Sequence, residues 1–128
     1  MRRDLDLVRD ILLFFEQRDS FSVMNDGDIE RELAFEGFRC QEVAYHLRLM
    51  AQANLIVLET IRSSPSDRII KVYPFELSWD GHEFLQLSKD SSRWQQFKRQ
   101  VGDGFKGITF DIAKAILISL AKAQVGLP

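Results

Sequence analysis

The sequence predicts an α+β protein that is mainly helical: a winged helix-turn-helix with additional C-terminal helices. Two observations support this fold class. The stretch RCQEVAYHLRLMAQANLI, residues 39–56, has the periodicity of an amphipathic helix that runs directly into a strand. A β-hairpin is predicted immediately afterwards, within residues 55–77. A helix with a polar face followed by a hairpin is the core of a winged helix, so the pattern favours DNA binding without naming a ligand.

Composition limits the class of protein. The 128 residues are 45% hydrophobic and 28% charged, which is typical of an ordered globular domain. The formal net charge of −2 means that any nucleic-acid binding must depend on a local basic patch. A single cysteine, Cys40, allows no internal disulfide, and the charged opening MRRDLDLVRD does not resemble a signal peptide. With no long apolar run either, we expect a cytoplasmic protein that does not span a membrane.

The first predicted helix covers residues 4–17, because its apolar side chains recur at helical spacing over a wide arc. Residues 28–38 fit two patterns. Ile29 and Leu33 are four apart, as in a short helix, whereas Leu33 and Phe35 alternate as in a strand; we favour the helix slightly. The central helix then buries a stripe made of Cys40, Val43, Ala44, Leu47, Met50 and Ala51.

The predicted wing consists of strands at residues 55–61 and 68–77, joined by a tip at residues 62–67. Pro74 cannot donate a ladder hydrogen bond, so the second strand should be irregular near it or end there. Ser78 is placed to cap a short helix within residues 79–90.

The remaining segments predict further helices. Trp94, Phe97 and Val101 are spaced for one of about three turns, followed by a flexible loop, GDGFKG, at residues 102–107. Thr109 or Asp111 could cap a last helix at about residues 110–124. We expect a winged-helix domain at residues 1–88 and a helical extension at residues 89–128 packed on it as one globular unit.

Three runs carry a resemblance to a known family: RRDLDLVRDILL, EVAYHLRLMAQANLI, and LSWDGHEFLQLSKD with Trp94 shortly after it. They resemble a bacterial and prophage family described as a domain of unknown function, over nearly the whole chain. The resemblance implies a winged-helix fold and a place in mobile elements. The central run is also similar to the recognition helix of ArsR-like and MarR-like regulators. Asn54 stands where those proteins commonly have Gly, and Arg39 where many have a Ser or Thr cap.

The candidate DNA-binding residues lie on the polar side of the central helix and in the wing. Arg can bridge two acceptors of guanine, Gln can do so on adenine, and both can reach phosphates. The candidates are Arg39, Gln41, Tyr45, Arg48, Gln52, Arg62, Arg68 and Lys71. Glu42 on the same side would repel phosphate, and an ordinary solvated helix face explains this pattern equally well.

Motifs for catalysis or for a bound cofactor are not evident. His46 and His82 have no neighbours at metal-ligand spacing, and GDGFKG lacks the ending of a phosphate-binding loop. Cys40, on the apolar stripe, is better explained as a packed thiol than as a nucleophile. We therefore expect no enzyme, no metal site and no cofactor. Trp79, Phe84, Trp94 and Phe97 are interpreted as the layer that packs the later helices onto the winged-helix core.

Two functional hypotheses remain. The first is a DNA-binding transcriptional regulator of a bacterial or mobile-element operon, acting as a homodimer. The second is a winged-helix interaction module that modulates a host or phage protein without binding DNA; the acidic balance and the mixed charges of the helix face favour it. For the homodimer, the candidate interface residues are Ile112, Ile116, Leu117 and Leu120 on the terminal helix. The competing interpretation folds that helix back against the first one.

Overall fold

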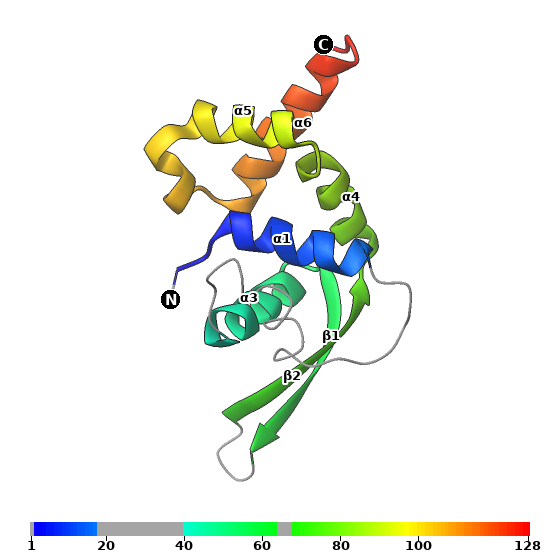
Figure 1. Cartoon of the computed structure of the whole chain (residues 1–128), viewed down its shortest axis with the longest axis vertical. Coiled ribbons are helices and arrows are strands. Elements are labelled where there is room, and N and C mark those ends of the chain that lie inside the picture. The colour runs from blue at the N-terminus through cyan, green and yellow to red at the C-terminus, as the bar shows by residue number, and fades with distance from the viewer. Residues whose placement is uncertain (1, 18–39, 64–67) are drawn as a thin grey trace. The chain divides into compact units, whose positions relative to one another are not determined.

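The computed structural model describes residues 2–17, 40–63 and 68–128. The chain forms two compact units, Met1–His82 and Glu83–Pro128 (Figure 1). We call them the N-terminal and C-terminal units. The described part is mainly helical with one two-stranded antiparallel sheet, which confirms the α+β prediction at that level.

The N-terminal unit is built around two helices and a hairpin. Helix α1 (Leu5–Glu16) packs against helix α3 (Cys40–Gln52) and strand β2 (Arg68–Leu77), and α3 packs against both strands of the hairpin. The apolar arc of α1 is as wide as its sequence predicts, since Leu5, Leu7, Val8, Ile11, Leu12 and Phe15 are all buried. From α3, the core takes Val43, Leu47 and Met50 of the predicted stripe.

Strand β1 (Ile56–Ser63) pairs with strand β2 (Arg68–Leu77) to form a hairpin that extends beyond α3 (Figure 1). The ladder shifts register twice, once between Val57 and Leu58 and once between Ile61 and Arg62. The first shift lies where Leu58 pairs with Pro74, so Pro74 makes the strand irregular without ending it. The first strand also runs two residues further than predicted, to Ser63.

Helix α4 (Trp79–Ser88) begins in the N-terminal unit and ends in the C-terminal one. The C-terminal unit continues with α5 (Ser91–Val101), a 3₁₀ helix η2 (Gly102–Gly107) and α6 (Phe110–Gln124). α5 packs against α6 and η2. Capping side chains fix the helix starts: Asp90 accepts from the Arg93 N–H, and Thr109, one of two predicted candidates, accepts from the Ile112 N–H.

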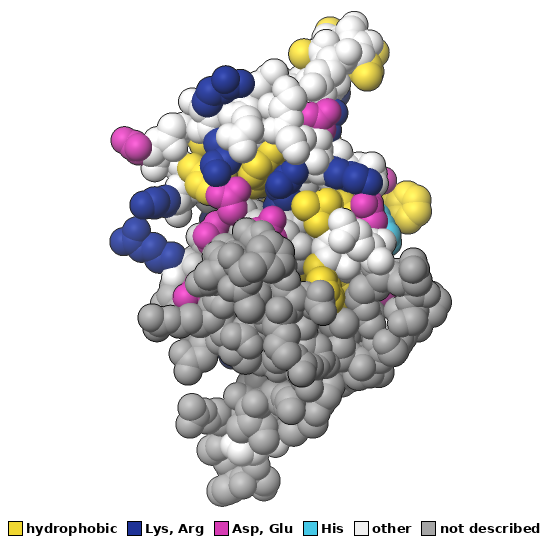
Figure 2. Space-filling view, in the orientation of Figure 1, with side chains coloured by type: hydrophobic (Ala, Val, Ile, Leu, Met, Phe, Trp, Pro, Cys, Tyr) yellow, Lys and Arg dark blue, Asp and Glu magenta, His cyan; other side chains and the backbone are white. Residues whose placement is uncertain are grey.

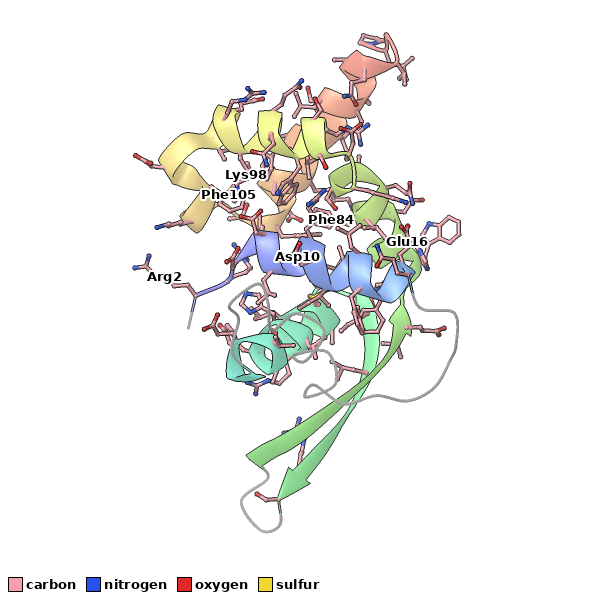
Figure 3. The ribbon with its side chains drawn as sticks, in the orientation of Figure 1. Arg2, Asp10, Glu16, Phe84, Lys98 and Phe105 are labelled. Carbon is pink, nitrogen blue, oxygen red and sulfur yellow. The ribbon has the colours of Figure 1, made fainter. Side chains whose placement is uncertain are left out.

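The segment GDGFKG is helical, so the prediction of a flexible loop there is wrong. Its one aromatic residue, Phe105, lies edge-on to Trp94 and Phe97, with ring centroids 6.2 and 5.9 Å away. Those contacts fix the segment against α5 although three of its six residues are glycine. Lys98 of α5 and Phe105 lie together, the Lys98 Nζ being 5.2 Å from the ring centroid (Figure 3).

A single guanidinium joins the helix ends of the C-terminal unit. Arg93 donates from Nε and Nη2 to the Gln124 side-chain oxygen at 2.8 and 2.6 Å. Its Nη1 donates to the carbonyls of Gln86 and Leu87 at 3.1 and 3.0 Å. These bonds satisfy backbone acceptors near the end of α4 that have no partner within the helix.

Candidate nucleic-acid interface

The end of α3 sets the direction in which the chain enters the hairpin. Asn54 has a φ of 65°, a left-handed conformation that Asn adopts more readily than most other non-glycine residues. The Leu55 N–H donates to the Met50 carbonyl at 2.8 Å, and the Asn54 N–H donates to Ala51 at 3.0 Å. This is a Schellman ending, in which Leu55 and Met50 are both buried. Strand β1 therefore leaves α3 through a defined turn.

A set of close contacts joins this turn to the start of α4; we call it the clasp. Its members are Asn54, Leu55, Ser78, Asp80 and Gly81. The Ser78 N–H donates to the Leu55 carbonyl at 2.9 Å, and the Ser78 hydroxyl donates to the Asn54 carbonyl. The hydroxyl also accepts from the Gly81 N–H at 3.0 Å, which confirms Ser78 as the predicted cap. The Asn54 amide donates to Asp80 Oδ2 at 3.3 Å.

Gly81 allows the clasp to close. A Cβ at this position would lie 1.9 Å from the Leu55 carbonyl oxygen, far inside any permitted contact. Because that oxygen belongs to the backbone, it cannot move aside without shifting β1. The run WDG after the second strand is thus explained by the close approach of α4 to the α3–β1 turn.

His46 connects α3 to the start of α1. Its Nε2 accepts from the Asp4 N–H at 2.8 Å, and its Nδ1 lies 2.8 Å from the Glu42 carbonyl. The acceptor role of Nε2 places the proton of the neutral ring on Nδ1, which then donates to that carbonyl. The side chain is only 2% exposed. Sequence reasoning had missed this structural role, although His46 lies between Val43 and Met50 at helical spacing.

Three of the predicted DNA-contacting residues form a row on α3. Tyr45, Arg48 and Gln52 succeed one another at intervals of three and four residues, which places them on one side of the helix. The guanidinium carbon of Arg48 is 6.0 Å from the Tyr45 ring centroid, a cation–π arrangement. Tyr45 also meets His46 edge-on at 5.7 Å, so the buried histidine supports the ring. Tyr45 and Arg48 are half-buried and Gln52 is exposed.

Of the other DNA-binding candidates, only Arg62 has a side chain that the structure describes. Arg62 is exposed near the end of β1, where it pairs with Ile69. Arg68 and Lys71 are placed in β2 and Gln41 in the first turn of α3, but their side chains lie outside the described part. Arg39, the 28–38 segment and most of the hairpin tip also fall outside the described residues.

The proposed dimer stripe is unevenly exposed. Ile112 is 54% exposed, Ile116 and Leu120 are half-buried, and Leu117 is fully buried. Leu117 thus already belongs to the core of its own chain. Beyond the helix, Val125 and Leu127 are also exposed.

Of the four aromatic residues assigned to a packing layer, Phe84, Trp94 and Phe97 are buried, but Trp79 is 78% exposed. The expectation for Trp79 is therefore wrong. It occupies the first position of α4.

Other kinds of site find little support in the described residues. Within ranges 2–17, 40–63 and 68–128, no three His, Cys, Asp or Glu side chains are grouped to hold a metal ion. None of the helices described there is long and apolar enough to cross a membrane. A shallow surface hollow of about 330 Å³ beside η2 is lined by Lys98, Gly102, Asp103, Phe105 and Lys106.

Comparison with known proteins places the chain in a family. Residues 2–109 match the family described as "Hypothetical protein (DUF2513)". A relative from Haemophilus influenzae, described as an uncharacterized protein, is 30% identical over 118 residues, covering 91% of this chain and 92% of the relative. No solved structure matches the chain. On the strength of both matches, the chain belongs to the DUF2513 family.

Proposed function

We propose that this protein is a winged-helix DNA-binding protein that regulates transcription of a bacterial or mobile-element operon. The observation that carries the proposal is the row Tyr45, Arg48 and Gln52 on a helix that leads through a fixed turn into a projecting hairpin (Figure 1). In winged-helix proteins the equivalent helix enters the major groove, where side chains reach base edges. The order of the described elements, helix, helix and hairpin, is compatible with this fold.

The row has the chemistry that base recognition requires. Arg48 can donate two hydrogen bonds to a guanine edge, and Gln52 can both donate to and accept from adenine. Stacking on Tyr45 limits the orientations open to the Arg48 guanidinium before binding. Arg62, on the hairpin, is suited to a phosphate contact, which would position the helix without reading sequence.

Charge sets the conditions under which binding should be seen. Residues 1–82 contain ten Lys and Arg but fifteen Asp and Glu, a formal net charge of −5. The whole unit therefore repels DNA, and attraction depends on the row and the hairpin. Salt screens both the repulsion between the unit and DNA and the attraction of basic side chains to phosphates, but the phosphate contacts weaken most steeply. We therefore expect measurable affinity mainly at low ionic strength.

We further propose that the active form is a homodimer that associates through α6, with Ile112 as its most exposed apolar contact. Two copies would double the number of Arg48 contacts and favour a two-fold symmetric operator. Light scattering at tens of micromolar protein tests this part. A monomer at that concentration would contradict the dimer. It would not contradict DNA binding, because a monomer can bind a single half-site.

The DNA proposal is tested with a duplex taken from upstream of the protein's own gene. Arg48→Ala should weaken binding at roughly 50 mM salt by about tenfold or more, since one bidentate base contact contributes about 1–3 kcal/mol. The matched control is Arg99→Ala, which removes an exposed arginine from α5 and should leave affinity within about twofold.

The absence of binding by the unaltered protein at low salt would contradict the proposal. The alternative would then be the protein-interaction module, with the same α3 face contacting a host or phage protein. In that case Arg48→Ala should weaken a reproducible protein complex instead.

A further inference from the structure

The most exposed large apolar side chain described in the N-terminal unit is Trp79, at 78%. An indole left in water forfeits the burial of one of the largest apolar surfaces a protein can offer. The protein's other tryptophan, Trp94, is 1% exposed. Trp is among the residues most enriched at the energetic centres of protein interfaces.

The backbone that carries Trp79 is held firmly. It lies between Ser78, which makes three of the clasp hydrogen bonds, and Asp80, which accepts from Asn54. None of those bonds uses the Trp79 side chain, so the clasp does not explain why this position carries an indole. An aromatic group presented from a rigid turn loses little conformational entropy when a partner covers it.

The neighbouring side chains select the partner by charge. Glu76 and Asp80 are both exposed, and Glu76 is three residues from Trp79, so their Cα atoms lie at most about 11 Å apart. Glu76 pairs across the hairpin with Val57, which is 48% exposed. Two carboxylates around two apolar side chains repel a phosphate backbone and attract cationic side chains. The deficit of five positive charges in residues 1–82 acts in the same direction.

We propose that Trp79, Val57, Glu76 and Asp80 form a docking surface for a basic, apolar segment of another protein. An aliphatic side chain of the partner covers the indole, and an adjacent Arg or Lys reaches the carboxylates or the indole face. The docking surface shares no residue with the α3 row. The inference does not depend on the DNA proposal.

The test uses the full-length protein and a fluorescently labelled synthetic peptide of alternating Leu and Arg, with binding followed by anisotropy. Trp79→Ser should weaken binding by about tenfold or more, and Trp79→Phe by less, because it retains an aromatic ring. The matched control, Val125→Ser, removes an apolar side chain of similar exposure, 71%, from the C-terminal unit and should leave affinity unchanged. A peptide of alternating Leu and Glu should not bind.

Three results would overturn the proposal. One is no binding of the Leu–Arg peptide at concentrations up to about 1 mM. Another is equal affinity for Trp79→Ser and the unaltered protein, which would indicate general attraction to an acidic unit. The third is a dimer of the protein alone that becomes monomeric in Trp79→Ser, because the occupant would then be a second copy of this chain.

Discussion

The junctions inside the N-terminal unit and those inside the C-terminal unit are formed by different kinds of interaction. In the N-terminal unit, hydrogen bonds to backbone atoms fix the junctions: the clasp joins the α3–β1 turn to α4, and His46 joins α3 to the start of α1. In the C-terminal unit, the junction of α5 and η2 is filled by aromatic rings, with Trp94, Phe97 and Phe105 in mutual contact. A hydrogen-bonded junction fixes the direction in which one element leaves another, whereas a cluster of aromatic rings mainly supplies buried apolar area.

Their charges differ as well. Residues 83–128 carry seven Lys and Arg against four Asp and Glu, a formal net charge of +3, whereas the N-terminal unit is at −5. Figure 2 shows Lys and Arg side chains over the region that Figure 1 labels α5. The unit that carries the helix and hairpin proposed to bind DNA is thus the acidic one. Recognition there must come from particular side chains such as Arg48, because the overall field opposes it.

The largest difference in stability is expected between substitutions of the two tryptophans, one in each unit. Trp94→Ala removes a buried ring that contacts Phe97 and Phe105, and should lower the free energy of unfolding by roughly 3–5 kcal/mol. Trp79→Ala should change it by no more than about 0.5 kcal/mol, because that side chain is exposed. Urea unfolding measures both.

Amide hydrogen exchange would show where the loss falls. In Trp94→Ala, exchange should rise more in residues 83–128 than in residues 1–82. An equal rise in both would mean that the aromatic cluster supports the whole chain, and the contrast between the units would not hold for stability.

The next effect concerns glycines. Gly81→Ala forces a methyl group against the Leu55 carbonyl and should cost about 1–3 kcal/mol or more. Gly104→Ala in η2 meets nothing within 4 Å and should be tolerated within about 0.5 kcal/mol. Thermal unfolding of both variants makes the comparison. If Gly81→Ala were as stable as the unaltered protein, the close approach of α4 to Leu55 would be wrong.

A smaller loss of stability is expected for His46, and His82 provides the comparison. His46→Ala leaves the Asp4 N–H and the Glu42 carbonyl without their side-chain partner, at a cost of about 1–3 kcal/mol. His82 is exposed, so His82→Ala is the control and should fall within about 0.5 kcal/mol. His46→Ala should also weaken DNA binding if the Tyr45 ring depends on His46 for its position. Equal stability of the two variants would remove His46 from the account of the junction.

For the described residues, sequence periodicity was sufficient for the α-helices and the hairpin, because those depend on local spacing of apolar residues. Local capping chemistry also identified Ser78 as the cap of α4. Sequence reasoning failed for Trp79 and for the GDGFKG segment, where the outcome depends on contacts between residues distant from one another in the chain. Phe105 is recognisable as an anchor only once Trp94 and Phe97 are seen beside it.

The candidate site could be predicted only in part. Helical spacing places Tyr45, Arg48 and Gln52 on one side, but it cannot show that Arg48 stacks on Tyr45. Nor does it show the hydrogen bond between His46 and Asp4, which joins residues 42 positions apart.

The smallest differences in stability are expected at two positive-φ positions, one in each unit: Asn54, with a φ of 65°, and Gly102, with a φ of 54°. Asn54→Ala should cost about 1–2 kcal/mol, because a Cβ is disfavoured in the left-handed region and Ala lacks the amide that binds Asp80. Asn54→Gly also loses that amide but relieves the backbone, so its stability should stay within about 0.5 kcal/mol of the unaltered protein. Gly102→Ala should cost about 1 kcal/mol, through its backbone alone, since its Cβ meets nothing within 4 Å. Urea titrations of the three variants measure this. If Asn54→Gly proved as unstable as Asn54→Ala, the Asn54–Asp80 hydrogen bond would outweigh backbone conformation, and the clasp would rest on its side chains more than on the Schellman turn.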